Sequence, residues 1–148
     1  MGTRQLNQMQ LAMDTAKKNE DEAASRLYSI KQKLAEEEQR LKTLLHYQQE
    51  YQKKATEKSL ETMHGALYHN QQIFIKNITE AVTKQYQQVE KFKVILDKQA
   101  QLWYSLKART QALATLITEI QKKLAYEENK REQQLQDELV QNKRRASE

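Results

Sequence analysis

The chain has 148 residues, of which 38% are hydrophobic and 30% are charged, with two glycines, no proline and no cysteine. So few apolar residues are unusual for a compact globule and typical of long helices or coiled coils, in which each helix buries only one stripe. The absence of cysteine excludes disulfides and thiolate metal sites and fits a reducing cytosol, and no stretch approaches the roughly 20 apolar residues of a membrane span. The net charge of +5 comes from signs mixed along the whole chain, which indicates a solvated helix surface and argues against nucleic-acid binding.

A heptad seam runs through the first third of the chain and predicts a helix over about residues 4–60. Apolar residues recur there at alternating spacings of three and four, which is the pattern of a left-handed coiled coil. The seam positions are Leu6, Met9, Met13, Ala16, Glu20, Ala23, Leu27, Ile30, Leu34, Glu37, Leu41, Leu44, Gln48 and Tyr51. The flanking residues are mostly charged or amide side chains, and Glu36 with Arg40 is predicted to form an ion pair four residues apart.

The same pattern predicts a second helix over about residues 70–140. Its seam positions are Ile75, Ile78, Val82, Gln85, Val89, Phe92, Leu96, Gln99, Trp103, Leu106, Thr110, Leu113, Ile117, Ile120 and Leu124. The stretch 127–148 has few apolar residues, and we expect a charged tail that is helical but unpaired. Trp103 is expected in the core, and Tyr104, which lies off the seam, on the surface.

The stretch 61–69 lies between the two seams and is predicted to be a turn with Gly65 at its apex. Leu6 and Leu124 are equidistant from residue 65, so residue i would face roughly residue 130 minus i. The predicted fold is all-α, a single domain over 1–148 formed by a long antiparallel two-helix coiled-coil hairpin. This register brings Glu20 opposite Thr110, either as a polar layer that fixes the register or by coincidence.

A second stripe accompanies the seam of the second helix at heptad spacing. Its members are Phe74, Ala81, Gln88, Ile95, Leu102, Arg109 and Leu116. Five of the seven are apolar, although a two-helix coiled coil needs only one seam on each helix. Either these residues widen the hairpin core, or part of the stripe faces a partner.

The sequence contains no constellation typical of catalysis. His64 and His69 lie five residues apart and His46 is distant, a spacing that does not suit zinc on one helix face. Gly-rich phosphate loops and nucleophile elbows are absent, and a two-helix hairpin offers no cleft in which to tune a carboxylate. We therefore expect no enzymatic activity, no metal site and no cofactor.

Three segments together resemble the FliJ family, the small coiled-coil component of the bacterial flagellar export apparatus. The segment 44–51, Leu-Leu-His-Tyr-Gln-Gln-Glu-Tyr, is similar to a family signature late in the first helix. The segment 70–78, Asn-Gln-Gln-Ile-Phe-Ile-Lys-Asn-Ile, is similar to the opening of the family's second helix. The segment 129–139, which contains Asp137-Glu138-Leu139, resembles the family's acidic tail.

This resemblance implies an antiparallel coiled coil similar to the central stalk of rotary ATPases. It would be a stalk that couples the hexameric flagellar export ATPase to the export gate protein FlhA and that associates with export chaperones. The paired termini would enter the ATPase ring, and the region near the turn would contact the gate. The family's gate-contacting face falls here on Phe74, Ile78, Ala81 and Gln85, although some members carry a basic residue at the position of Gln85. We expect a monomer, cytoplasmic and peripheral at the inner face of the inner membrane, without membrane insertion.

Two other functions fit the same pattern. In the first, the chain stays straight through Gly65 and dimerises as a self-associating structural coiled coil. In the second, it is the equivalent stalk of a virulence-type secretion system.

Overall fold

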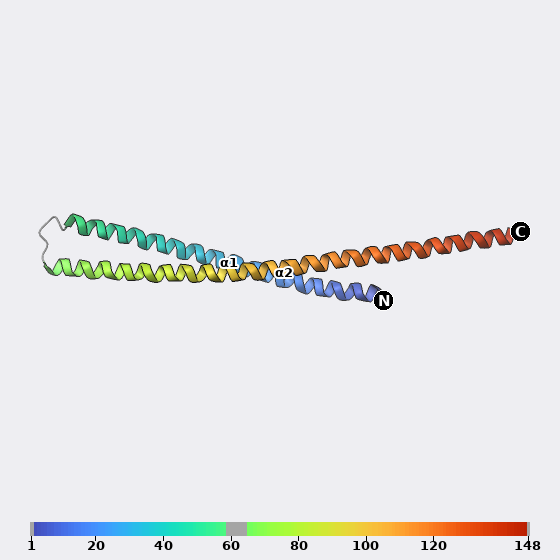
Figure 1. Ribbon diagram of the computed structural model, residues 1–148, viewed down its shortest axis with the longest axis horizontal. Coiled ribbons are helices and arrows are strands. Elements are labelled where there is room, and N and C mark those ends of the chain that lie inside the picture. The colour runs from blue at the N-terminus through green and yellow to red at the C-terminus, as the bar shows by residue number, and fades with distance from the viewer. Residues whose placement is uncertain (1, 59–64, 148) are drawn as a thin grey trace. The chain divides into compact units, whose positions relative to one another are not determined.

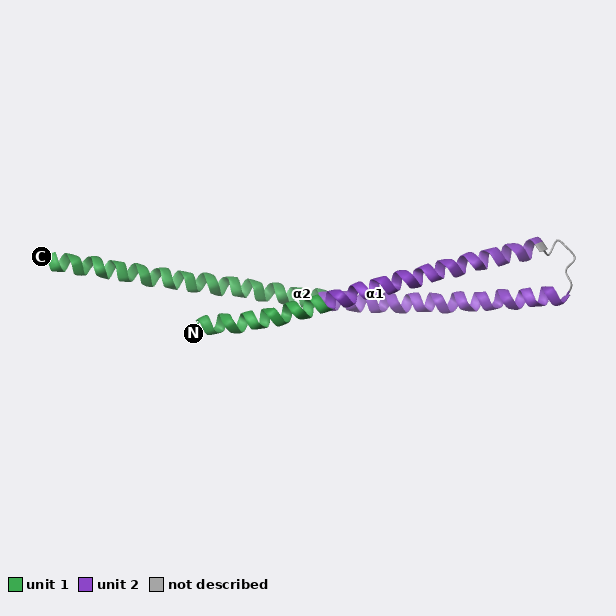
Figure 2. Ribbon diagram, turned by 180° about the vertical axis from the view of Figure 1, so that it is seen from behind, with its two compact units in different colours: residues 1–22, 104–148 green, residues 23–103 purple. Residues whose placement is uncertain are grey.

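The computed structural model describes residues 2–58 and 65–147, and all of these residues are helical. Helix α1 spans Gly2–Lys58 and helix α2 spans Gly65–Ser147. Figure 1 shows both as continuous helical ribbons. The chain forms two compact units, residues 1–22 with 104–148 and residues 23–103, which Figure 2 colours separately. We call them unit 1 and unit 2. Within each unit α1 and α2 pack against each other in antiparallel orientation, so the predicted all-α antiparallel hairpin is confirmed.

The two seams form the contact between the helices. All fourteen seam positions of α1 and all fifteen of α2 are buried or half-buried, and most residues between them are exposed. The most buried apolar side chains are Ala16, Ala23, Leu27, Val82 and Val89. Because two helices can shield only the side chains that lie directly between them, the rest of the seam is half-buried rather than enclosed.

The register differs from the predicted one by about four residues. Four contacts across the helix pair define it: Gly2 with Leu124, Glu37 with Gln85, Gln48 with Thr79, and Tyr51 with Phe74. The numbers in these pairs add up to between 122 and 127, so residue i lies opposite roughly residue 126 minus i. Leu124 therefore lies at Gly2 rather than Leu6, and a Cβ added at Gly2 would overlap the Leu124 side chain.

Of the two interpretations of Glu20 and Thr110, the polar layer is wrong and the coincidence holds, because this register does not place the two residues opposite each other. Thr110 is buried and donates its hydroxyl hydrogen bond to the Leu106 carbonyl oxygen on its own helix, 3.0 Å away. Glu20 forms an ion pair with Lys17, also on its own helix. The register places Thr110 opposite Ala16, where the small alanine leaves room for the threonine side chain.

The predicted boundaries of the turn also need correction. Helix α2 begins at Gly65 rather than near residue 70, so residues 65–69 are helical, and it ends at Ser147 rather than near 140. Gly65 has no positive φ, and an added Cβ would meet no atom within 4 Å. Its role is therefore that of a first helical residue, followed by the good helix formers Ala66 and Leu67. The part of the predicted turn over residues 61–64 lies outside the described residues, and the single domain over 1–148 stays a prediction.

Candidate partner-binding surfaces

The predicted gate-binding residues occupy two kinds of position on α2. Phe74 is 46% exposed, whereas Ile78, Ala81 and Gln85 are half-buried beside α1. The ring of Phe74 packs on Tyr51 of α1, with the ring centroids 4.6 Å apart at an interplanar angle of 56°. Such a tilted aromatic pair holds both rings in place, while much of the Phe74 side chain stays exposed.

This aromatic pair joins two segments that the sequence resemblance treats separately. Tyr51 closes the segment 44–51 and Phe74 lies in the segment 70–78, so the hairpin brings the first two resembling segments together. The ammonium of Lys54 lies 5.7 Å from the centroid of the Tyr51 ring, within the range of a cation–π interaction. Lys54 was not among the residues predicted to bind a partner. Its position could have been found, because Lys54 lies seven residues after Tyr47, which precedes the seam residue Gln48. Residues that precede equivalent seam positions lie on the same side in both helices of an antiparallel coiled coil.

Gln85 makes its hydrogen bonds within the hairpin. Its Nε2 donates to the backbone carbonyl oxygen of Glu37, 2.9 Å away, and also to the Glu37 carboxylate. The guanidinium of Arg40 donates to the other carboxylate oxygen at 3.0 Å. Arg40 thus pairs with Glu37 and not with Glu36 as predicted, because Glu37 lies in the seam, where a carboxylate needs donors.

The side of unit 2 on which Phe74 lies, which we call the Phe74 side, carries more apolar surface toward the start of α2. Leu67 lies seven residues before Phe74, and therefore on the same side of α2, and is 58% exposed. On α1, Tyr47 precedes the seam residue Gln48 and is 49% exposed. A hollow lined by Gln39, Arg40, Thr43, Leu44 and Gln85 lies one to two turns further along. Clustered exposed aromatic and aliphatic side chains of this kind are typical of a protein–protein contact surface.

The second stripe is divided between core and surface. Ala81, Gln88 and Ile95 are half-buried, whereas Phe74, Leu102, Arg109 and Leu116 are exposed. The half-buried members widen the hairpin core, whereas a partner-facing role of the exposed members stays a prediction. Of the neighbouring aromatic residues, Trp103 is half-buried and Tyr104 is 64% exposed.

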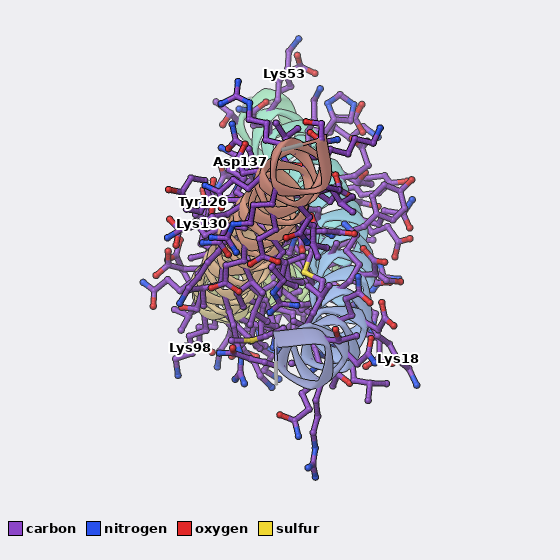
Figure 3. All side chains as sticks on the ribbon, turned by 90° about the vertical axis from the view of Figure 1, so that its right-hand side faces the viewer. Lys18, Lys53, Lys98, Tyr126, Lys130 and Asp137 are labelled. Atoms are coloured by element: carbon purple, nitrogen blue, oxygen red, sulfur yellow. The ribbon has the colours of Figure 1, made fainter. Side chains whose placement is uncertain are left out.

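Another candidate surface, separate from the Phe74 side and from the second stripe, lies in unit 1 at the end of α2. Every residue from 125 to 147 is exposed, so this part of α2 has no packing partner among the described residues. Its large apolar side chains are Tyr126, Leu135, Leu139 and Val140, each at least 52% exposed. Tyr126, Lys130 and Asp137 project from the same side of this segment (Figure 3).

The described residues include no cluster of three or more His, Cys, Asp or Glu side chains arranged to hold a metal ion. Within the same residues, neither helix has a stretch long and apolar enough to cross a membrane. His69 is exposed, His46 pairs with Glu50 at 3.1 Å, and His64 lies outside the described residues.

Comparison with known proteins finds a family match over nearly the whole chain. The sequence model of the family described as "Flagellar FliJ protein" matches residues 5–148. The chain is 28% identical over 128 residues to the Flagellar FliJ protein of Escherichia coli strain K12, and the match covers 86% of this chain and 87% of the relative. No solved structure matches. The chain therefore belongs to the FliJ family and is a flagellar protein connected with the export apparatus.

Proposed function

We propose that this chain is a stalk that couples the export ATPase ring to the export gate protein FlhA and escorts export chaperones. It binds the gate through the start of α2 and the ATPase ring through the terminal end in unit 1. It acts as a monomer, peripheral at the cytoplasmic face of the inner membrane, without catalysis of its own. The observation that carries this proposal is the exposed Phe74 ring, which is fixed on Tyr51 within a run of exposed apolar side chains.

The geometry gives the four gate-binding residues unequal roles. Phe74 is the anchor, because it is the most exposed of the four and because aromatic side chains contribute most of the binding energy in typical interfaces. Ile78 and Ala81 form the floor beside it. Gln85 shapes the surface indirectly, since its amide nitrogen holds Glu37 on α1.

The exposed end of α2 supports binding to a ring. A helix with no packing partner over residues 125–147 presents its whole circumference, and Leu135 with Leu139 lies one turn apart on one face. The interior of a ring can contact all sides of such a helix. The charged side chains of this segment keep it soluble when it is unbound.

Binding to the purified cytoplasmic domain of FlhA tests the gate assignment. We expect Phe74→Ala to weaken binding by about tenfold or more, as for an interface hot spot, with unchanged helicity by circular dichroism. Tyr86→Ala is the matched control, because Tyr86 is an aromatic residue of unit 2 that is 49% exposed and does not lie on the Phe74 side. Equal binding by Phe74→Ala and the unchanged protein would contradict the assignment, as would an equal loss in Tyr86→Ala.

Binding to the hexameric export ATPase tests the other end. The double change Leu135→Ser and Leu139→Ser is expected to weaken ATPase binding and to leave FlhA binding unchanged. Phe74→Ala is expected to weaken FlhA binding and to leave ATPase binding unchanged. Val140→Ser is the control, since Val140 is 52% exposed but lies off the face shared by the two leucines. If both variants weaken both interactions, the assignment of one partner to each end is wrong.

The two other functions are weighed against the same observations. The straight chain of the self-associating alternative is wrong, because α1 and α2 pack on each other within the chain. The family match favours the flagellar over the virulence-type apparatus. Sedimentation tests the proposed monomer directly, and a concentration-dependent dimer would overturn it.

A further inference from the structure

One face of α2 in unit 2 combines lysines with aliphatic side chains and lies beyond the proposed gate-binding residues. Its residues alternate at spacings of four and three, so they form a continuous row along the helix. We call it the lysine–aliphatic face, and it consists of Lys84, Gln88, Lys91, Ile95, Lys98 and Leu102. At 1.5 Å per residue, the row is about 27 Å long.

The aliphatic members of this face are accessible beside the hairpin seam. Of the two aliphatic residues, Leu102 is 42% exposed and Ile95 is half-buried, and the polar Gln88 is also half-buried. The three lysines are exposed, and Lys98 projects outward at the periphery in Figure 3. An apolar row with long cationic side chains along one border is the arrangement that accepts an amphipathic helix.

Basic side chains of α1 border the other side of the row. Arg26, Lys33 and Arg40 each precede a seam position of α1, as Gln88, Ile95 and Leu102 do on α2. Residues in these equivalent positions lie on the same side of an antiparallel coiled coil. Unit 1 shows this directly, because Ala12 and Asn19 of α1 line a common hollow with Arg109 of α2.

The lysines of this face differ from the lysine on the other side of α2. Lys93 there is paired with Glu90 at 3.4 Å. Among the described residues, no carboxylate forms an ion pair with Lys84, Lys91 or Lys98, and no acidic residue belongs to the face. Its positive charge is therefore available to a partner, which an acidic side chain would neutralise on binding.

We propose that the lysine–aliphatic face docks an acidic amphipathic helix of a partner protein. The apolar side chains of that helix would pack on Ile95 and Leu102, and its Glu or Asp residues would pair with the flanking lysines. Charge decides against a second copy of this chain, because two such faces would bring like charges together. The apolar row argues against nucleic acid, which would use the lysines but not the aliphatic side chains. This inference does not depend on the gate assignment.

A designed peptide tests the chemistry with the full-length chain. The probe is a labelled amphipathic peptide of about 21 residues, long enough to cover the row, with leucines on one face and glutamates beside them. Its binding is measured by fluorescence anisotropy at low and high salt. The triple change Lys84→Glu, Lys91→Glu and Lys98→Glu is expected to weaken binding by about tenfold or more and to abolish most of its salt dependence.

The matched control carries the same change of charge elsewhere in unit 2. It changes three exposed lysines outside the face, by Lys42→Glu, Lys53→Glu and Lys76→Glu. This variant is expected to change peptide binding by less than about twofold, because solvent screens a distant charge. The pair Ile95→Gln and Leu102→Gln is expected to lower affinity but to preserve the salt dependence, a separation that general loss of structure would not produce. Circular dichroism of each variant checks the helicity.

Four results would overturn the proposal. The first is an equal loss of binding in the control variant, and the second is equal binding of a peptide that has lysines in place of the glutamates. The third is binding of the chain to anionic lipid vesicles or single-stranded RNA but not to the acidic peptide. The fourth is peptide binding that neither set of changes in the face affects. The gate assignment is read separately, since FlhA binding of the triple lysine variant should equal that of the unchanged protein. A loss of FlhA binding there would contradict the separation of the two surfaces.

Discussion

Helix α2 contains two stretches that are equally helical but have opposite surroundings. Over residues 75–124, a side chain packs on α1 at every third or fourth position, whereas over 125–147 every residue is exposed. The first stretch is stabilised by burial. The second has only the intrinsic propensity of its Glu, Gln, Lys, Arg and Leu residues and the advantage of continuing a helix that has already formed. The comparison indicates that the seam holds the fold, while the exposed end of α2 is available for partners.

The largest expected difference comes from removing a leucine in each stretch. Leu27 is 8% exposed in the seam and Leu135 is 58% exposed in the unpaired stretch. Leu27→Ala is expected to lower the free energy of unfolding by about 2–4 kcal/mol, because it leaves a cavity between the helices. Leu135→Ala should change it by less than about 0.5 kcal/mol. Urea unfolding followed by circular dichroism measures both, and similar losses would mean that the end of α2 also packs.

Gln85 tests whether the polar contact within the seam stabilises the hairpin. Gln85→Ala removes one donor from the half-buried Glu37 carboxylate and is expected to cost about 1–3 kcal/mol in unfolding free energy. Gln101→Ala is the control, since Gln101 hydrogen-bonds only to Asp97 on its own helix at an exposed site. If the two variants are equally stable, the hydrogen bond to Glu37 contributes nothing to the pairing of the helices.

Gln99 is expected to behave in the opposite way. Its Oε1 is buried and accepts no hydrogen bond from the residues that the structure describes. Gln99→Leu should therefore raise the unfolding free energy by about 1 kcal/mol or more, because it removes an unsatisfied polar atom from an apolar contact. Thermal unfolding checks this, with Gln133→Leu in the unpaired stretch as a control that should have little effect. A destabilised Gln99→Leu would show that the amide finds a partner in solution.

The smallest expected effect concerns the ion pair of Arg40. Its side chain is 67% exposed, so the bond to Glu37 is partly screened by solvent. Arg40→Gln should cost about 0.2–1 kcal/mol, less than Gln85→Ala does. Arg131→Gln, in the unpaired stretch, should cost less still. Urea unfolding at low and high salt resolves the difference, which should narrow as salt increases, and a larger loss for Arg40→Gln than for Gln85→Ala would reverse the ranking.

The sequence was sufficient for the elements but not for the way they align. Heptad spacing identifies the residues that face the partner helix, and each of the 29 predicted seam positions is buried or half-buried. Periodicity does not fix the register, because a shift of four residues exchanges one apolar layer for another. The glycine suggested an apex at residue 65, but Gly65 already belongs to α2. The true alignment follows from individual contacts such as Gly2 with Leu124.

The sequence also predicts exposed residues better than it predicts the contacts that polar side chains make. Phe74 could be assigned to the surface from its position beside the seam, and it is exposed. The same spacing could not show that Gln85 would turn toward Glu37, because a seam glutamine can bond within the hairpin or present its amide to a partner. Its direction depends on the acceptor that the register brings opposite, so the register had to be known first.

The small side chain of Ala23 has a mechanical consequence. It is fully buried, and the register places it opposite Trp103, so a small residue accommodates a large one. If α1 slid by one heptad toward the C-terminal end of α2, Trp103 would meet Ile30 and Leu6 would meet Glu127. A slide in the other direction would uncover Ile120 and Leu124. The two helices therefore resist axial sliding, and a push on one of them is passed to the other instead of being lost as slippage.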